Sequence, residues 1–256
     1  MNLGDLVIIK DEQSPIIYII EEIINDDVYL KGSNYRIRLI KKKEELILAP
    51  INIVKKEQEK NDKYIKKIKT QQLPRTSKKP MFGRILHIDG DPKYLDSCMN
   101  LYKEMGIYAE GIYIKEKEVK NKIEKIITQT TPDIIVITGH DIYNGKGKHD
   151  LSNYENTSHF IDALRIIRKR YYQDQVTVII GACCSNFEAL IGNGANFASS
   201  PSRINIHTYD PAVIAIKVAS TSIDRFVDFD SCVKLIENGK RAFGGVETKG
   251  KMKLLL

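Results

Sequence analysis

Two segments, 134–141 (IIVITGHD) and 176–184 (VTVIIGACC), decide the fold of this chain. Each is a short, β-branched apolar run that ends at a reactive side chain, His140 in the first and Cys183 in the second. Such runs are typical of buried parallel strands. Because ligands and catalytic groups gather outside the carboxyl ends of the strands in an open α/β sheet, we expect both side chains at one rim. A thiol and an imidazole in that place indicate a cysteine nucleophile with its base.

Strand and helix patterns alternate on both sides of these segments, from residue 81 to the end of the chain. Further strands are predicted at 84–88, 107–114, 204–209 and 212–218, and helices at 94–105, 119–128, 158–171 and 230–238. Repeated strand–helix–strand units with right-handed crossovers build a mostly parallel sheet between two layers of helices. The fold class predicted for 81–256 is therefore a three-layer α/β sandwich.

Residues 1–54 predict a separate, small β-module. The runs LVII, IIYIIEEII, DVYLKG and YRIRLI are β-branched or aromatic, and turn residues stand at 25–27 and 32–34. Several short strands in so short a stretch indicate an SH3-like β-barrel. No cluster of polar side chains marks an active site there, so we expect a binding or docking module.

The segment 55–80 carries the basic excess of the chain. It has ten Lys or Arg and three acids, an excess that equals the formal net charge of +7. A confined run of charge is typical of a solvated linker or helix, and a binding arm for an acidic partner is the alternative. Because the rest of the chain is balanced, the charge pattern argues against a nucleic-acid partner.

The cysteines and the apolar runs indicate the compartment. Four cysteines lack CxxC spacing, which predicts neither a disulfide framework nor a zinc site: Cys98, Cys183, Cys184 and Cys232. There is no HExxH motif, so no metal is expected, and the chemistry inferred above needs no cofactor. No signal peptide or membrane span is recognisable, and a cytosolic protein with reduced thiols is expected.

Local sequence favours Cys183 over its neighbour as the nucleophile. Ser185 and Glu188 fit the S-x-x-E capping box of a helix start, and a helix N-terminus favours a thiolate. A buried packing role is the alternative for either cysteine, and Cys184 is expected to point the other way and to pack. His207, in a predicted strand, is a second histidine that can line a cleft at this rim of the sheet.

The segment IIVITGHD, whose histidine stands 43 positions before the cysteine of VIIGACCSNFEALIG, resembles the caspase and clostripain-like peptidase clan. With LGDLVIIK, RILHIDGDPKYL and ANFASSPSRINIHTYDPA, the resemblance is closer to the sporulation-specific peptidase family called YabG and covers essentially the whole chain. It implies a caspase-like fold for 81–256 and a cysteine endopeptidase of spore-forming bacteria. Such an enzyme acts on spore coat and related proteins in the mother-cell cytoplasm and cleaves after basic residues, particularly Arg. His140 and Cys183 fall on the family's catalytic positions.

The resemblance also suggests further site residues. The clan usually has Gly after the histidine, where this chain has Asp141, and the amides of Cys183 and Asp141 are the expected oxyanion donors. Arg-specific members of the clan place an acid in the substrate pocket, and the candidates are Asp141, Asp210 and Asp224. A preference for Arg makes Arg75, in the proline-flanked stretch LPRTS, a site for self-cleavage. The oligomeric state and the ligand of the module stay open.

Two other functions fit parts of the sequence. RILHIDGDPKYL is similar to the start of a response-regulator receiver domain, with Asp89 and Asp91 as its acidic pair. Thr138, however, stands where such a domain needs its phosphoacceptor aspartate, so the acidic turn is interpreted as the start of a helix. The third hypothesis is a basic SH3-like adaptor for nucleic acid with no catalysis, which predicts strongly salt-dependent binding.

Overall fold

The computed structural model describes residues 1–13, 15–71, 73 and 78–255. The predicted self-cleavage site at Arg75 lies outside the described residues. Three sheets are present in the described part of the chain: one of five strands near the N-terminus, one of six strands, and a two-stranded pair. The pair joins β6 (Pro80–Met81) to β13 (Lys253–Leu254) in antiparallel register.

The N-terminal sheet forms where the β-branched runs predict strands. Its strands are β1 (Leu6–Ile9), β2 (Tyr18–Ile24), β3 (Asp27–Gly32), β4 (Arg38–Lys42) and β5 (Leu46–Leu48), in the antiparallel order β4-β3-β2-β1-β5. One 3-10 turn, η1 (Lys43–Glu45), joins the last two strands. Alternate side chains of the strands build a small apolar core of Val7, Tyr18, Ile20, Val28, Leu30 and Leu46. This sheet is called the module below.

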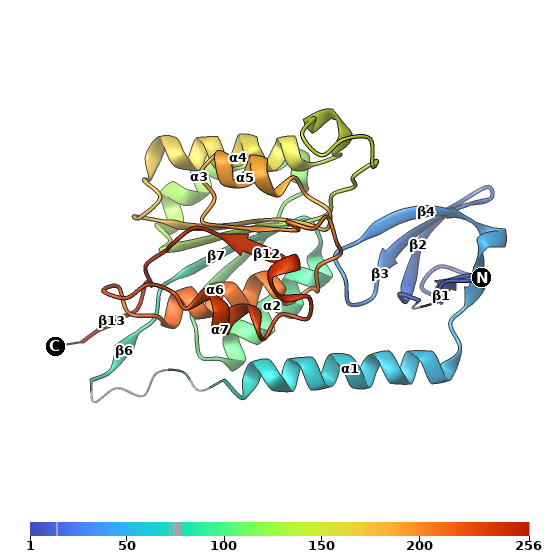
Figure 1. Ribbon diagram of the computed structural model, residues 1–256, viewed down its shortest axis with the longest axis horizontal. Coiled ribbons are helices and arrows are strands. Elements are labelled where there is room, and N and C mark those ends of the chain that lie inside the picture. Colours follow the sequence, from blue (N-terminus) through green and yellow to red (C-terminus); the bar gives the residue numbers. More distant parts are fainter. Residues whose placement is uncertain (14, 72, 74–77, 256) are drawn as a thin grey trace.

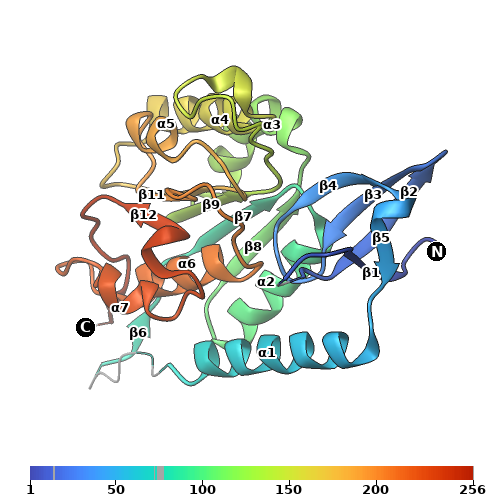
Figure 2. The same cartoon turned by 45° about the vertical axis from the view of Figure 1, so that its right-hand side comes forward.

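A long helix follows the module. α1 (Ile51–Lys69) occupies most of the segment expected as a linker, and its Lys side chains are largely exposed. Figures 1 and 2 show it running from the module along the α/β unit. Its last turns pack there, with Ile68 fully buried and the Tyr64 hydroxyl donating to Asp210 at 2.6 Å. No helix among the described residues has both the length and the apolar composition needed to cross a membrane.

The six-stranded sheet is mostly parallel, as predicted. Its strands are β7 (Ile85–Asp89), β8 (Ala109–Tyr113), β9 (Ile134–Thr138), β10 (Thr177–Gly181), β11 (Phe197–Ser199) and β12 (Phe243–Gly245), in the order β12-β11-β10-β9-β7-β8. Only β12 is antiparallel to its neighbour. Every residue of β7, β9 and β10 is buried, which explains why these strands are continuous apolar runs.

Helices cover both faces of this sheet (Figure 1). On one face lie α3 (Glu116–Thr130), α4 (Thr157–Arg170) and α5 (Phe187–Gly192), and on the other α2 (Pro92–Glu104), α6 (Asp210–Ser220) and α7 (Phe229–Val233). Short 3-10 turns, η2 (Leu151–Asn153) and η3 (Gly239–Arg241), lie in the connections. The chain runs from β7 to β8 on one side and then to β9 on the other, so the strand order reverses between β7 and β9. This is the switch point at which α/β sheets bind ligands.

Three predictions after residue 200 are wrong. The segment 212–218 forms helix α6 and not a strand. Nearly every residue of α6 is buried, so its sequence lacks the regular spacing of polar residues that identifies an amphipathic helix. Pro211 in the first turn is a helix-start signal. The segment 204–209 joins no sheet, although His207 makes an isolated antiparallel bridge to Tyr35 of the module. The helix predicted at 230–238 is only the short α7.

Candidate active site at the switch point of the sheet

The strand register brings His140 and Cys183 to one rim. β9 and β10 are adjacent and parallel, and Thr138 pairs with Gly181 at their carboxyl ends. His140 and Cys183 each stand two residues beyond that pair, so they leave the sheet at equivalent positions of neighbouring strands. No hydrogen bond joins the two side chains in this conformation, in which all hydrogen-bonding atoms of both residues are described.

The turn that carries Cys183 is fixed by serine hydroxyls. Gly181 has φ +124°, and a Cβ there would lie 2.2 Å from Oγ of Ser199, so only glycine fits. Ser199 Oγ donates to the carbonyl of Ala182 at 2.7 Å, and the amide of Ala182 donates to Ser185 Oγ at 2.9 Å. Cys184 has φ +58°, an unusual conformation for a residue other than glycine. Strained, over-determined turns of this kind cluster at functional sites.

The Cys183 thiol is buried and neutral in this conformation. Its side chain has 0% exposure, and the Ile206 amide donates a hydrogen bond to Sγ at 3.2 Å. Burial raises the pKa of the thiol well above its usual range, although the bond from Ile206 opposes the rise. The predicted capping box is wrong, because Asn186 and not Ser185 caps α5 by accepting from Ala189. The helix therefore begins too late to put Cys183 in its first turn.

Cys184 faces a different part of the structure. Its Sγ donates to the carbonyl of Arg203 at 3.3 Å. Burial, with the negative charge of Asp141, raises the pKa of its thiol to about 11. The two neighbouring cysteines thus have separate hydrogen-bond partners, Ile206 for one and Arg203 for the other.

His140 is held on three sides. Its amide donates to Glu116 Oε1 at 2.7 Å, and its carbonyl accepts from Asn156 Nδ2 at 3.0 Å. Its ring lies 5.6 Å from the ring of Tyr94, and Nε2 is 3.4 Å from Asp91 Oδ2. The other ring nitrogen, Nδ1, is buried and has no hydrogen-bond partner among the described residues. A histidine with one nitrogen on a carboxylate and the other unpaired is arranged as a general base.

Asp91 joins the α/β unit to the module. Its Oδ1 caps α2 by accepting from the amides of Lys93 and Tyr94, which confirms the predicted helix start. Its Oδ2 lies 2.9 Å from Lys31 Nζ and 3.2 Å from Arg38 Nη2, both from the module. Burial alone raises the pKa of a carboxyl, but hydrogen bonds from His140 and Lys31 hold that of Asp91 well below its usual range.

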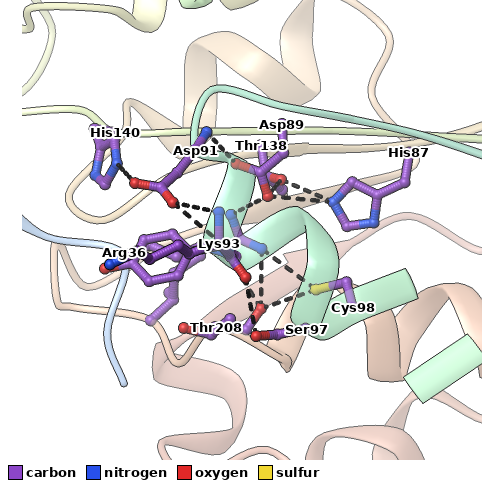
Figure 3. A network of polar contacts seen from close by, with 12 residues as sticks. Arg36, His87, Asp89, Asp91, Lys93, Ser97, Cys98, Thr138, His140 and Thr208 are labelled. Carbon is purple, nitrogen blue, oxygen red and sulfur yellow. Dashed lines mark hydrogen bonds and ion pairs between the residues drawn. The ribbon is translucent and has the colours of Figure 1, made fainter. Parts of the chain in front are cut away.

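A second acid, Asp89, lies deeper and pairs with Arg36 of the module. Both side chains are fully buried, and Arg36 Nη1 is 2.6 Å from Asp89 Oδ2 (Figure 3). Thr138 Oγ1 also donates to this oxygen, at 2.9 Å, and His87 lies beside the pair. The pKa of Asp89 falls to about 2 because the Arg36 charge outweighs the effect of burial. Both acids of the receiver-like turn are thus paired with cations of the module.

The predicted pocket acids lie in three different places. Asp141 is buried and accepts from the amide of Asn156 at 2.7 Å and from the Thr157 hydroxyl. Asp210 is buried at the start of α6, where burial raises its pKa to about 7. Asp224 is exposed, in the turn after α6. The structure therefore does not gather these three carboxylates.

His207 follows Ile206, whose amide donates to Cys183 Sγ. It is buried against the rings of Tyr35 and Tyr64, at centroid distances of 5.6 and 4.6 Å. Burial lowers its pKa to about 3, so it is neutral.

The sequence patterns did not predict Glu116, whose carboxylate accepts a hydrogen bond from the amide of His140. An acid in the first turn of a helix is common, and nothing in the sequence links this one to a residue 24 positions away.

A cavity of about 650 Å³ opens beside His140, between the module and the carboxyl edge of the sheet. Its lining includes Glu21, Arg38, Tyr113, Glu116, His140 and Asn156. Concave sites with convergent polar groups at a switch point are where α/β proteins bind their substrates.

Comparison with known proteins identifies a family for this chain. The family model described as YabG peptidase U57 matches residues 2–256. The sporulation-specific protease YabG of Bacillus subtilis (strain 168) is 40% identical over 177 residues, which are 68% of this chain and 61% of that protein. The chain thus spans less than two thirds of the length of this relative. On the match across its length, the chain belongs to the YabG peptidase U57 family.

Proposed function

We propose that this chain is a sporulation-specific cysteine endopeptidase in which Cys183 is the nucleophile and His140 is the base. The observation that carries the proposal is the register of β9 and β10, which sets both residues two positions beyond a paired Thr138 and Gly181. Membership of a peptidase family and the name of the Bacillus subtilis relative support proteolysis during sporulation.

The proposed reaction follows the chemistry of the two side chains. His140 Nδ1 accepts the thiol proton as Cys183 Sγ forms a bond to the peptide carbonyl carbon. The tetrahedral intermediate collapses, the C–N bond breaks, and His140 returns the proton to the leaving amine. Water activated by His140 then hydrolyses the thioester and restores the thiol. Rotation of the side chains to bring Nδ1 to Sγ precedes the first step.

Main-chain amides are the proposed oxyanion donors. Those of Cys183 and Asp141 donate to no other residue in the described part of the chain, whereas the amide of His140 is taken by Glu116. Two free amides beside the nucleophile and the base suit a developing negative charge, and removal of one such donor typically costs about 100-fold or more in turnover.

The finer assignments rest on the family resemblance. We propose cleavage after Arg, spore coat and related spore-assembly proteins as substrates, and action in the mother-cell cytoplasm beside the forming coat. We also propose a caspase-like fold for 81–256, with an SH3-like module at 1–54 and a basic connection at 55–80. The five-stranded sheet, α1 and the mostly parallel sheet are compatible with this division.

Substitution of the proposed nucleophile tests this function. Cys183→Ala is expected to reduce cleavage of an Arg-containing protein substrate by at least about 1,000-fold, because the covalent step is lost. Circular dichroism and the melting temperature should show that the variant is folded. Undiminished cleavage by Cys183→Ala would refute the proposal.

Cys184→Ser is the matched control, since it removes the adjacent thiol and leaves Cys183 in place. It should keep most of the activity. An inactive but folded Cys184→Ser variant, together with an active Cys183→Ala variant, would show that Cys184 and not Cys183 is the nucleophile.

A further inference from the structure

One stretch of the module pairs with the chain beside the proposed nucleophile through a single antiparallel β-bridge. The Arg36 amide donates to the carbonyl of Ile206 at 3.0 Å, and the Thr208 amide donates to the carbonyl of Asn34 at 2.9 Å. Between them, Tyr35 and His207 form an antiparallel bridge. Addition of an extended segment to an exposed backbone edge is a general mode of peptide recognition.

The pairing places Arg36 next to the nucleophile. Ile206 accepts from the Arg36 amide through its carbonyl and donates through its own amide to Cys183 Sγ. One residue of the 206–208 edge therefore contacts both the sulfur and the main chain of Arg36. A substrate strand that used this edge would pass the sulfur at the same point.

The side chain of Arg36 fills a pocket that matches a guanidinium group. Nη1 binds Asp89, and Nε and Nη2 lie 3.2 and 3.0 Å from the carbonyl of Thr208. Nη2 also lies 3.5 Å from Cys98 Sγ (Figure 3). The centroid of the Tyr94 ring lies 5.3 Å from Cζ. An acid, a carbonyl and an aromatic face together recognise the charge, the donors and the plane of arginine.

We propose that Arg36 is a built-in pseudosubstrate, which occupies the pocket for the substrate's arginine side chain, and that Asp89 is the acid that selects arginine there. This inference rests on the proposed cysteine peptidase activity and names its specificity residue. In the state described, 34–36 takes the place of the substrate and Cys183 is fully buried. Cleavage of another protein then requires this stretch to leave the 206–208 edge.

Asp89 fits this role better than the three acids suggested by the sequence. Asp141 is engaged by Asn156 and Thr157, and Asp224 is exposed on another part of the surface. Asp210 accepts from Tyr64 and from the amide of His207. Only Asp89, among these four, already holds a guanidinium beside the nucleophile.

Binding tests the pocket without any need for activity. In the Cys183→Ala background, Arg36→Ala empties the pocket, and added Nα-acetyl-arginine amide should raise the melting temperature. The citrulline analogue, which has the same shape and no charge, should not. At the same concentration, the chain that keeps Arg36 should respond much less to the arginine compound, because Arg36 competes for the pocket, and Arg36→Ala with Asp89→Asn should not respond. An equal response with Asp89→Asn, or no response in a folded Arg36→Ala variant, would overturn the assignment.

Activity gives the second readout, on peptides with Arg or citrulline before the scissile bond. Arg36→Ala in the otherwise wild-type chain should raise kcat/KM for the Arg peptide, because a competing occupant is gone. Adding Asp89→Asn removes both buried charges together and should lower the preference for Arg over citrulline by about 100-fold or more. Lys41→Ala is the matched control: it removes a cation from β4 that pairs with Glu45 outside the pocket, and it should change neither value.

These experiments separate the two proposals. If no cleavage depends on Cys183, the proposed function fails whatever the binding shows. If Cys183-dependent cleavage after Arg is present but insensitive to Arg36 and Asp89, only the pseudosubstrate inference fails.

A further measurement needs no substitution in the module. It therefore tests the inference even if the Arg36→Ala variant does not fold. Saturating Arg peptide added to Cys183→Ala should accelerate hydrogen exchange at the Arg36 amide, which would lose its partner Ile206. Unchanged exchange there with bound peptide would also overturn the inference.

Discussion

At the scale of single residues, His140, the proposed base, has its main chain fixed on both sides. Its amide and carbonyl are fixed by Glu116 and Asn156, so the ring is positioned by the backbone before any substrate arrives. Asp91 faces Nε2, and within the described part of the chain Nδ1 has no hydrogen-bond partner. A carboxylate on one ring nitrogen stabilises the imidazolium that forms when the other accepts a proton.

His140→Ala is therefore expected to lower kcat by about 1,000-fold or more while the fold is kept, because the proton carrier is lost. Steady-state kinetics on an Arg peptide measure the effect, and the melting temperature checks the fold. His149→Ala, at an exposed histidine nearby in sequence, is the matched control and should be fully active. The base is misassigned if His140→Ala stays active and His207→Ala does not.

At the scale of elements, α1 and α6 meet through a buried carboxyl. Asp210, in the first turn of α6, accepts from Tyr64 of α1 at 2.6 Å and from the amide of His207 at 2.9 Å. Burial raises its folded-state pKa to about 7, from an ordinary value of 3.8. The folded state thus keeps this proton at pH values where the unfolded chain has lost it, and folding is weakened as the pH rises from 3.8 to about 7.

Asp210→Asn should remove this dependence. Relative to wild type, the free energy of unfolding of the variant should rise with pH across that interval, by up to about 1.4 kcal/mol per unit of pKa difference, and stay level above it. Urea unfolding at about pH 5 and about pH 8 measures the change. Asp224→Asn, at an exposed acid, should show no such rise. A constant difference between Asp210→Asn and wild type at both pH values would contradict the assignment.

The elements differ in how far sequence predicts them. β7, β9 and β10 are short apolar runs bounded by turn residues, and their period and length identify them. α6 is apolar on every side because it lies in the core, so no periodicity separates it from a buried strand. Only Asp210-Pro211 at its start indicates a helix.

The same distinction holds for the candidate site. The rim residues His140 and Cys183 were predicted because each follows a recognisable strand. The pairing of Arg36 with Asp89 was not, because it joins residues 53 positions apart whose partnership depends on how the module docks. Sequence patterns report local structure, and such a contact between distant segments has no local signature.

At the scale of the whole molecule, the module is fastened to the α/β unit by buried charges. Arg36–Asp89 and Lys31–Asp91 are pairs with little or no exposure, and breaking one partner of such a pair typically costs about 3–5 kcal/mol. Outside them, Lys60 of α1 contacts Glu237 near the surface. These contacts hold the first 70 residues against the rest of the chain without relying on the covalent connection.

This attachment bears on the proposed self-cleavage after Arg75. An enzyme with a preference for Arg should nick its own proline-flanked LPRTS stretch, and aged wild-type protein should show a new N-terminus at Thr76. The two fragments should nevertheless elute together in size-exclusion chromatography, because the buried pairs persist, and should separate only in denaturant. Cys183→Ala and Arg75→Gln are the controls, and both should stay intact. An uncut wild-type chain, or equal nicking of Cys183→Ala, would rule out self-cleavage, whereas nicked fragments that separate without denaturant would show that the module is held by the chain connection alone.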